Sequence, residues 1–286
     1  MTLRPSLISE LSSHIADAAA SLRPLRLISR GTWLPRGNAE AEPLDLTAFN
    51  GIVEFEPGDL TITVGAATTI AELDAVTAAH NLWCPLAPWG GDAGSVGATI
   101  ATATTGPFAE SLGRPRDLVL GLECVDGTGK VLTPGGKVVK NVAGFDLVRL
   151  MTGAWGTLAA ITRVSLRLRA RPAADESWVV RVPGTAIEVQ RALRQSATPP
   201  MACEVLRDRE LLVRIAGNTA FVAAARESVR RAGDAEPCDA SAWDALRIAA
   251  TNREPRTPTD PAVRALNARV KAAFDPSNIL NPGVLG

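Results

Sequence analysis

Hydrophobic residues recur at helical spacing near both ends of the chain. Leu7, Leu11 and Ile15 are four positions apart in the segment 7–22, so this segment is predicted to be an amphipathic helix. A second helix is predicted to begin at Asp260-Pro261, because an aspartate cap followed by proline is a common helix start. Its apolar face contains Val263, Leu266, Val270 and Phe274, and Asp275-Pro276 is expected to end it.

Between these helices, short apolar runs separated by turn residues predict β-strands. The clearest run is 157–168, where Val164, Leu166 and Leu168 alternate with polar residues as in a half-buried strand. A helix is predicted after Thr69, because Thr69 and Glu72 have the spacing of a capping box. Further strands are predicted at 25–28, 52–55, 60–64, 118–125 and 130–133.

The pattern changes after residue 172. Segments of strand, helix, strand, strand and helix character follow in that order, which suits a small ferredoxin-like unit. Their expected ranges are 178–182, 186–195, 201–206, 210–215 and 220–231. The next segment, 238–259, is rich in Pro, Arg, Thr and Asp, and it is predicted to be a loop with one weak helical piece around Trp243.

Composition narrows the class of protein. The 286 residues suffice for one large or two modest domains, and 30 basic residues balance 30 acidic ones, which argues against a nucleic-acid partner. No run of apolar residues is long enough to predict a membrane-spanning helix, and no signal peptide is evident, so a cytoplasmic location is expected. Four scattered cysteines and two histidines, His14 and His80, favour reduced thiols and predict no metal site.

The candidate chemistry lies in a glycine-rich stretch at 85–99. Glycines at 90, 91, 94 and 97 would let the backbone approach a ligand closely, and successive N–H groups of such a loop can bind an anion. The spacing is G-x-x-G-x-x-G, so it matches neither the dinucleotide fingerprint nor the P-loop. Two interpretations are open: tight turns between buried strands, or a site for a cofactor that bears a pyrophosphate.

Four segments in this order, 85–99, 111–117, 140–147 and 150–162, together with 275–283, resemble a known family. They are similar to the FAD-binding domain of the vanillyl-alcohol oxidase (PCMH) type, and within it to the flavoprotein subunits of bacterial glycolate oxidases. The resemblance implies an α+β fold: a two-part FAD-binding domain at 1–172, a reduced ferredoxin-like α/β cap domain at 173–259, and a C-terminal helix and tail at 260–286 that return to the FAD domain.

The resemblance also implies which residues contact FAD. In the family, a glycine turn after the first strand holds the pyrophosphate, and here Gly31 occupies that turn with Ser29 in place of a second glycine. The expected cofactor-binding residues are Arg30, Gly31, Thr32, Pro88, Gly91, Gly94, Ser95, Val96, Gly97, Thr102, Gly106, Gly113, Arg116, Asp117, Gly156 and Ile161. For Arg116 and Asp117, an ion pair that ties the loop to the sheet is favoured over a catalytic role.

Many members of the family attach flavin covalently through a histidine just after this turn. Thr32 and Trp33 stand there in this chain, and no histidine occurs between positions 15 and 79, so non-covalent FAD is expected. The catalytic residues stay unassigned, apart from Lys140 as a candidate. A lysine near the flavin would stabilise negative charge on the reduced ring, although Lys140 could equally pair with a carboxylate at the surface.

Relatives that oxidise 2-hydroxy acids carry a segment H-x-G-D-G-N-x-H, which this sequence lacks. Three hypotheses follow. The favoured one is an FAD-binding subunit of a glycolate or related 2-hydroxy-acid oxidase, which passes electrons or supports a larger catalytic subunit. The second is an independent flavin enzyme whose acid or base is Glu204, Arg207 or Arg253. The third, suggested by Ser29, is a structural subunit that has lost its flavin.

The favoured hypothesis predicts partners. They would be a larger catalytic flavoprotein and an iron–sulfur subunit, through which the chain could lie peripherally at the inner face of the cell membrane. Trp243, the loop 252–258 and the remaining cap surface are the expected docking regions.

Overall fold

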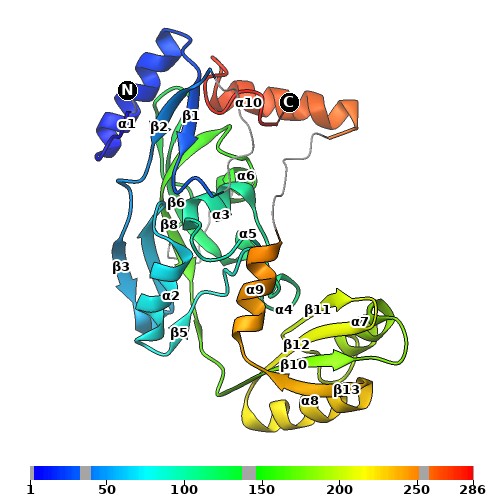
Figure 1. Ribbon diagram of the computed structural model, residues 1–286. Helices are drawn as coiled ribbons and strands as arrows, with labels where there is room; N and C mark the ends of the chain where they lie inside the picture. Colours follow the sequence, from blue (N-terminus) through cyan, green and yellow to red (C-terminus); the bar gives the residue numbers. More distant parts are fainter. Residues whose placement is uncertain (1–2, 33–39, 137–145, 251–257, 286) are drawn as a thin grey trace.

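The computed structural model describes residues 3–32, 40–136, 146–250 and 258–285. Figure 1 shows a larger unit that contains both ends of the described chain and a smaller unit built on a separate sheet, with helix α9 (Ser241–Ala249) between them. Both units combine sheets with helices. The cofactor-binding residues expected from the sequence all belong to the larger unit.

A five-stranded antiparallel sheet forms the centre of the larger unit, in the order β3-β4-β8-β6-β7. Val164, Leu166 and Leu168 are buried while Arg163 and Arg167 are exposed, so the alternation seen in the sequence reflects a half-buried strand. The strands are β3 (Ile52–Glu56), β4 (Thr61–Gly65), β6 (Val119–Asp126), β7 (Val131–Leu132) and β8 (Ala159–Arg167).

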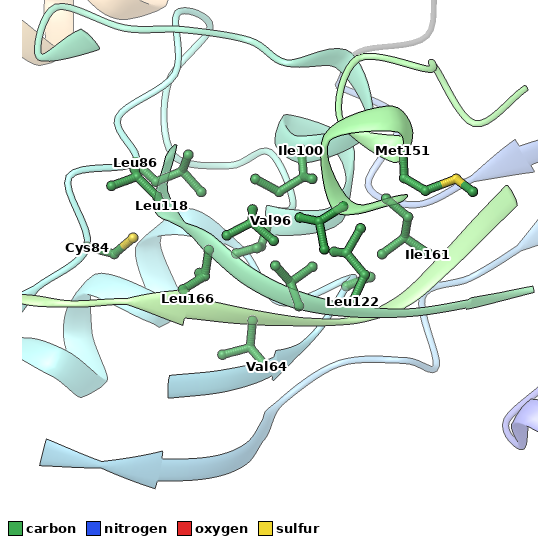
Figure 2. Packing of buried hydrophobic residues seen from close by; sticks show 14 of the residues in the cluster. Val64, Cys84, Leu86, Val96, Ile100, Leu118, Leu122, Met151, Ile161 and Leu166 are labelled. Atoms are coloured by element: carbon green, nitrogen blue, oxygen red, sulfur yellow. The ribbon is translucent and has the colours of Figure 1, made fainter. Parts of the chain in front are cut away.

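Short helices pack on one face of this sheet. The main core lies between these helices and the sheet. Figure 2 shows Val96 and Ile100 of helix α3 packed above Leu122 and Leu166 of the sheet. The predicted capping box is present at the start of α2, where Thr69 and Glu72 cap each other. The helices are α2 (Ile70–Ala78), α3 (Val96–Thr102), α5 (Pro115–Leu118) and α6 (Leu147–Met151), whereas α4 (Ala109–Leu112) places Leu112 in the cluster around Trp243.

A second layer covers part of the opposite face. Helix α1 (Ile8–Ala20) buries Leu11, Ile15 and Ala18 in a cluster that includes residues of β6 and β8, whereas Leu7 is exposed and only precedes the helix. Strand β1 (Leu25–Ile28) pairs in parallel with β2 (Glu42–Asp45) in the same layer. The helix and first strand predicted from the sequence are therefore confirmed.

The C-terminal segment returns to this layer, as the family resemblance implied. Helix α10 (Pro261–Phe274) begins at Asp260, whose carboxylate accepts a bond from Ala262 N–H, and Val270 and Phe274 pack on the central core. Val263 and Leu266 are exposed. The residues after the helix then run beside β1, where Leu25 and Leu280 form a parallel bridge.

The smaller unit is an antiparallel sheet in the order β11-β12-β10-β13, covered by two helices. The order β-α-β-β-α-β along the chain is ferredoxin-like. Its last strand was not expected, because Asp234, Glu236 and Pro237 are unusual in a strand, but β13 lies at the sheet edge where such residues are tolerated. The elements are β10 (Ala174–Arg181), α7 (Ala186–Arg194), β11 (Ala202–Arg207), β12 (Glu210–Gly217), α8 (Thr219–Ala232) and β13 (Asp234–Cys238).

Helix α9 confirms the helical piece predicted around Trp243 and shows that it covers Ser241–Ala249. Trp243 is only 2% exposed, and its indole N–H donates to the Ser177 hydroxyl at 3.1 Å. It packs in a cluster with Trp83 and Phe108 of the larger unit and Leu212 of the smaller one. Trp243 therefore joins the two units and is not available as a docking residue for a partner. The loop 252–258 lies almost wholly outside the described residues.

A buried arginine fastens α9 to the glycine-rich stretch. Arg247 is 6% exposed, and its Nε donates to Pro88 O at 3.2 Å while its guanidinium pairs with the Asp92 carboxylate. Gly90 N–H donates in return to Arg247 O at 2.7 Å. The first part of the glycine-rich stretch is therefore held against α9.

Replacing Arg247 tests this link. Arg247→Met should lower the free energy of unfolding by about 2 kcal/mol, because a charge-assisted hydrogen bond is lost and Asp92 keeps an unpaired charge. Urea unfolding measures the change, with Arg209→Met as the control because Arg209 is exposed. Equal stability of the two variants would show that α9 does not depend on Arg247.

Candidate cofactor site

The larger unit contains a cavity with about 790 Å³ of empty space, part of it open to solvent. The cavity lies where the end of β1, the end of β4, helix α3, the start of β8 and the C-terminal tail meet. Its lining residues are Leu27, Ile28, Ser29, Arg30, Gly31, Thr32, Leu46, Ala66, Ala67, Ser95, Gly97, Ala98, Ala101, Thr102, Trp155, Gly156, Ala159, Ile161, Asn281 and Val284.

The turn after β1 presents backbone amides that have no acceptor within the described part of the chain. Among the described residues, no acceptor bonds the amides of Ser29, Arg30, Gly31 and Thr32. The positive φ of this turn falls on Gly31, at +71°, and not on Ser29, whose hydroxyl instead contacts the Ser95 hydroxyl at 3.1 Å. Ser29 is thus compatible with the turn, and the reason for expecting a flavin-free subunit disappears.

The glycine-rich stretch has a different role from the one predicted. Its amides at the start of α3 have protein acceptors: Val96 N–H donates to Thr68 O at 2.8 Å and Gly97 N–H to Ala66 O at 2.7 Å. A Cβ on Gly97 would lie 2.6 Å from the Cβ of Ala66. Gly97 therefore allows α3 to approach the end of β4, and the amides of Val96 and Gly97 are bonded within the protein.

Part of the predicted set of cofactor-binding residues lies together on the cavity wall. These residues come from three separate stretches of sequence, which the fold brings to one place. They are Arg30, Gly31, Thr32, Ser95, Gly97, Thr102, Gly156 and Ile161.

The other predicted residues lie away from the cavity wall, each with a structural role. Pro88 accepts the bond from Arg247, and Gly91 packs against Ile248 of α9. A Cβ on Gly106 would overlap Ala87 O, so glycine is required there for packing alone. Gly94, Val96 and Gly113 do not line the cavity either.

Arg116 and Asp117 also lie away from the cavity. They form an exposed ion pair at 3.7 Å, and Asp117 accepts the Arg114 N–H at the start of α5. The pair lies within α5 and its cap, so it does not tie the loop to the sheet as the sequence analysis expected.

Sequence reasoning missed several cavity residues. Ala66 and Ala67 follow β4, and Ala98, Ala101 and Ala159 face the cavity from α3 and β8. Small apolar side chains carry no chemical signal of their own, so only the tertiary arrangement identifies them. Asn281 is different, because a polar side chain in an otherwise buried tail is a signal from which sequence reasoning could have identified it as a site residue.

Arg30 is the only charged residue among the described residues that line the cavity. Its Nε donates to Ala67 O at 3.0 Å, and its guanidinium lies 3.7 Å from the Glu72 carboxylate. The pKa of Glu72 is lowered, chiefly by the hydrogen bond from Thr69 N–H, with a smaller contribution from Arg30. Arg30 is thus a fixed cation beside the free amides, suited to an anionic group.

Acid–base candidates do not come together at this cavity. Glu204 lies on β11 with its pKa raised by burial, next to Arg194 at 3.5 Å, and Arg207 pairs with Glu210 at 3.0 Å. His80 is exposed beside Phe55, and His14 is on α1. Lys140 and Arg253 lie outside the described residues. Within the described part of the chain, no group of His, Cys, Asp or Glu could hold a metal ion.

The C-terminal tail completes the cavity wall. The Asn281 side chain accepts Leu27 N–H at 2.8 Å and donates to Trp155 O at 2.9 Å. Upstream, the fully buried Asp275 carboxylate pairs with Lys271 at 2.5 Å. Burial lowers the pKa of Lys271, and the Asp275 carboxylate partly offsets this effect.

Comparison with known proteins identifies the family. Residues 1–135 match the family described as "FAD binding domain", and residues 255–285 match "FAD linked oxidases, C-terminal domain". This chain has the FAD-binding domain of the FAD-linked oxidases. Its cofactor is FAD.

Curated relatives agree with this assignment. Glycolate oxidase subunit GlcE of Escherichia coli K12 is 33% identical over 65% of this chain and 53% of its own length. D-lactate dehydrogenase of Archaeoglobus fulgidus is 31% identical over 73% of this chain and 48% of its own length. Glycolate oxidase subunit GlcD of Bacillus subtilis is 32% identical over 59% of this chain and 37% of its own length. The chain thus matches about half, or less, of the length of these relatives.

Solved structures show the same fold at low sequence identity. An alkyldihydroxyacetonephosphate synthase structure aligns with a TM-score of 0.78 at 14% identity, covering 98% of this chain and 76% of that one. A second structure of that enzyme aligns with a TM-score of 0.71.

The cavity fits the chemistry of FAD. A pyrophosphate needs donors without other acceptors, and the amides of Ser29 to Thr32 together with Arg30 provide them. The flat apolar parts of a dinucleotide need a smooth apolar wall, which the alanines and Ile161 provide. Both the acceptor-free amides and the apolar wall belong to the described part of the chain.

Gly31 provides a direct test of the cavity. In Gly31→Ala the new Cβ meets no protein atom within 4 Å, so it would obstruct only the cofactor, and we expect FAD affinity to fall by about tenfold or more. Gly51→Ala is a matched control: its φ is +87°, its surroundings are equally open, and it lies off the cavity. Both variants should lose about 1 kcal/mol of stability from the left-handed backbone. Equal FAD affinity of the two variants would remove the β1 turn from the site.

The mode of attachment gives a second test. Because the turn carries Thr32 where a covalent histidine would stand, acid precipitation of the FAD-loaded protein should release all the flavin into the supernatant. Flavin absorbance in the supernatant and in the redissolved pellet measures the distribution. Flavin that stays in the washed pellet would contradict non-covalent binding.

Proposed function

We propose that this chain is the FAD-binding subunit of a glycolate or related 2-hydroxy-acid oxidase, and that it works with a larger catalytic flavoprotein and an iron–sulfur subunit. The proposal is supported by its similarity to proteins named as glycolate oxidase subunits GlcE and GlcD and as D-lactate dehydrogenase. FAD, when bound, supplies two-electron redox chemistry to such a complex.

The residues that line the cavity support a division of tasks between this chain and a catalytic subunit. Removing hydrogen from a 2-hydroxy acid needs a base within reach of the hydroxyl proton and cations for the carboxylate. Of these groups, the described cavity wall contains only Arg30, which lies beside the free amides and is thereby assigned to the cofactor. This chain would therefore hold and orient FAD, while another subunit would bind and activate the acid.

The chain's own residues then have limited tasks. The β1 turn and Arg30 bind the anionic part of the cofactor, the alanine-rich wall of α3 excludes water, and Asn281 fixes the backbone on two sides. The independent-enzyme alternative gains no support from Glu204 or Arg207, because neither lines the cavity. We place the complex in the cytoplasm, peripheral to the membrane through its partners. No helix among the described residues is long and apolar enough to cross a bilayer.

Activity of the separate chain tests this proposal. The purified protein loaded with FAD should oxidise neither glycolate nor D-lactate with an artificial dye acceptor, because the described cavity wall contains no base for the substrate. Co-expression with the two proposed partner subunits should give a complex that reduces the dye when glycolate is added. Gly31→Ala in this chain should lower the activity of that complex, whereas Gly51→Ala should not. Rapid turnover of either acid by the chain alone would favour an independent enzyme.

A further inference from the structure

The last residues of the described chain form a wall of the cofactor cavity, far in sequence from the rest of it. Leu25 N–H donates to Ile279 O at 2.7 Å, and Asn281 N–H donates to Leu25 O at 2.9 Å, so the tail extends beside β1. Ile279 and Leu280 are 1% and 0% exposed. Val284 then lines the cavity together with Asn281.

Asn281 connects two walls of the cavity by hydrogen bonds from its side chain. Its Oδ1 accepts from Leu27 on β1, and its Nδ2 donates to the carbonyl of Trp155, next to Gly156. Asn281 and Trp155 both have positive φ, at +43° and +55°, an uncommon conformation that the surrounding contacts must hold in place. When the tail leaves, both walls lose this connection.

A buried ion pair holds the tail in position. The Asp275 carboxylate accepts from Ile279 N–H at 3.1 Å and Leu280 N–H at 2.8 Å, and from Lys271 Nζ at 2.5 Å. Lys271 Nζ also donates to Thr157 O at 2.6 Å and Leu280 O at 2.9 Å. Apart from the Lys271–Asp275 pair itself, each of these bonds connects the end of α10 with the tail or with the segment just before β8. Removing one partner from such a buried pair leaves an uncompensated charge.

We propose that residues 271–284 are a latch on the cofactor cavity, so that closure of the tail and binding of FAD favour each other, with Lys271 and Asn281 as positioning residues. The proposal rests on the assignment of the cavity to FAD. Because Asn281 and Val284 line the cavity only when the tail is docked, the docked tail binds FAD more tightly than the open tail does. Thermodynamic linkage requires the reciprocal effect, that bound FAD keeps the tail docked.

Variants on α10 test whether the docked tail raises the affinity for FAD. Lys271→Met should raise the Kd for FAD by about tenfold, the middle of the range for coupled sites, as measured by quenching of flavin fluorescence. Arg269→Met removes the same charge from an exposed position on α10 and should leave the Kd within about twofold of wild type. Lys271→Arg should restore part of the affinity, because the cation is kept. Equal Kd values for Lys271→Met and Arg269→Met would overturn the latch.

Hydrogen exchange in the wild-type protein tests whether bound FAD keeps the tail docked. This measurement needs no variant. FAD at saturation should slow exchange of the Leu280 and Asn281 amides by about tenfold or more, while the Val213 amide on β12 should not change. Unchanged tail exchange with FAD bound would overturn the latch and leave the FAD assignment intact. Wild-type protein with no affinity for FAD would overturn both.

Discussion

The close approach of Gly97 to Ala66 is the constraint on which the site depends. Helix α3 can lie on the end of β4 only because position 97 has no Cβ, and the Gly97 N–H bond to Ala66 O fixes the contact at 2.7 Å. This contact makes α3 one wall of the cavity and the residues after β4 another. It also uses the Val96 and Gly97 amides internally, so these two amides are not available to an anion, whereas those of Ser29 to Thr32 have no acceptor among the described residues.

A buried arginine and a half-buried lysine then hold distant segments against this framework. Arg247 ties α9 to Pro88 and Asp92, and Lys271 ties the C-terminal tail to Thr157 and Asp275. In both cases the guanidinium or ammonium group also bonds backbone carbonyls, which offsets the cost of removing it from water. The first link places the smaller unit beside the glycine-rich stretch, and the second closes the cavity beside β1.

Much of the fold could be predicted from the sequence, because periodicity reports burial. The alternation at Val164, Leu166 and Leu168 and the capping box at Thr69 each specify a local structure without tertiary information. Composition misled the prediction at β13, which carries charges and a proline at a sheet edge. The helical piece around Trp243 was predicted, but the burial of Trp243 between the two units was not. For the site, glycines required for packing, such as Gly106 and Gly91, look the same in sequence as glycines that face a ligand, such as Gly31.

A crystal structure of the FAD-loaded protein tests the central claim most directly. The account predicts that the pyrophosphate oxygens lie within hydrogen-bond distance of the amides of Ser29 to Thr32, with Asn281 docked between Leu27 and Trp155 as described. Flavin density in the separate groove beside Arg194 and Met201, between the two units, with the β1 turn empty, would contradict it.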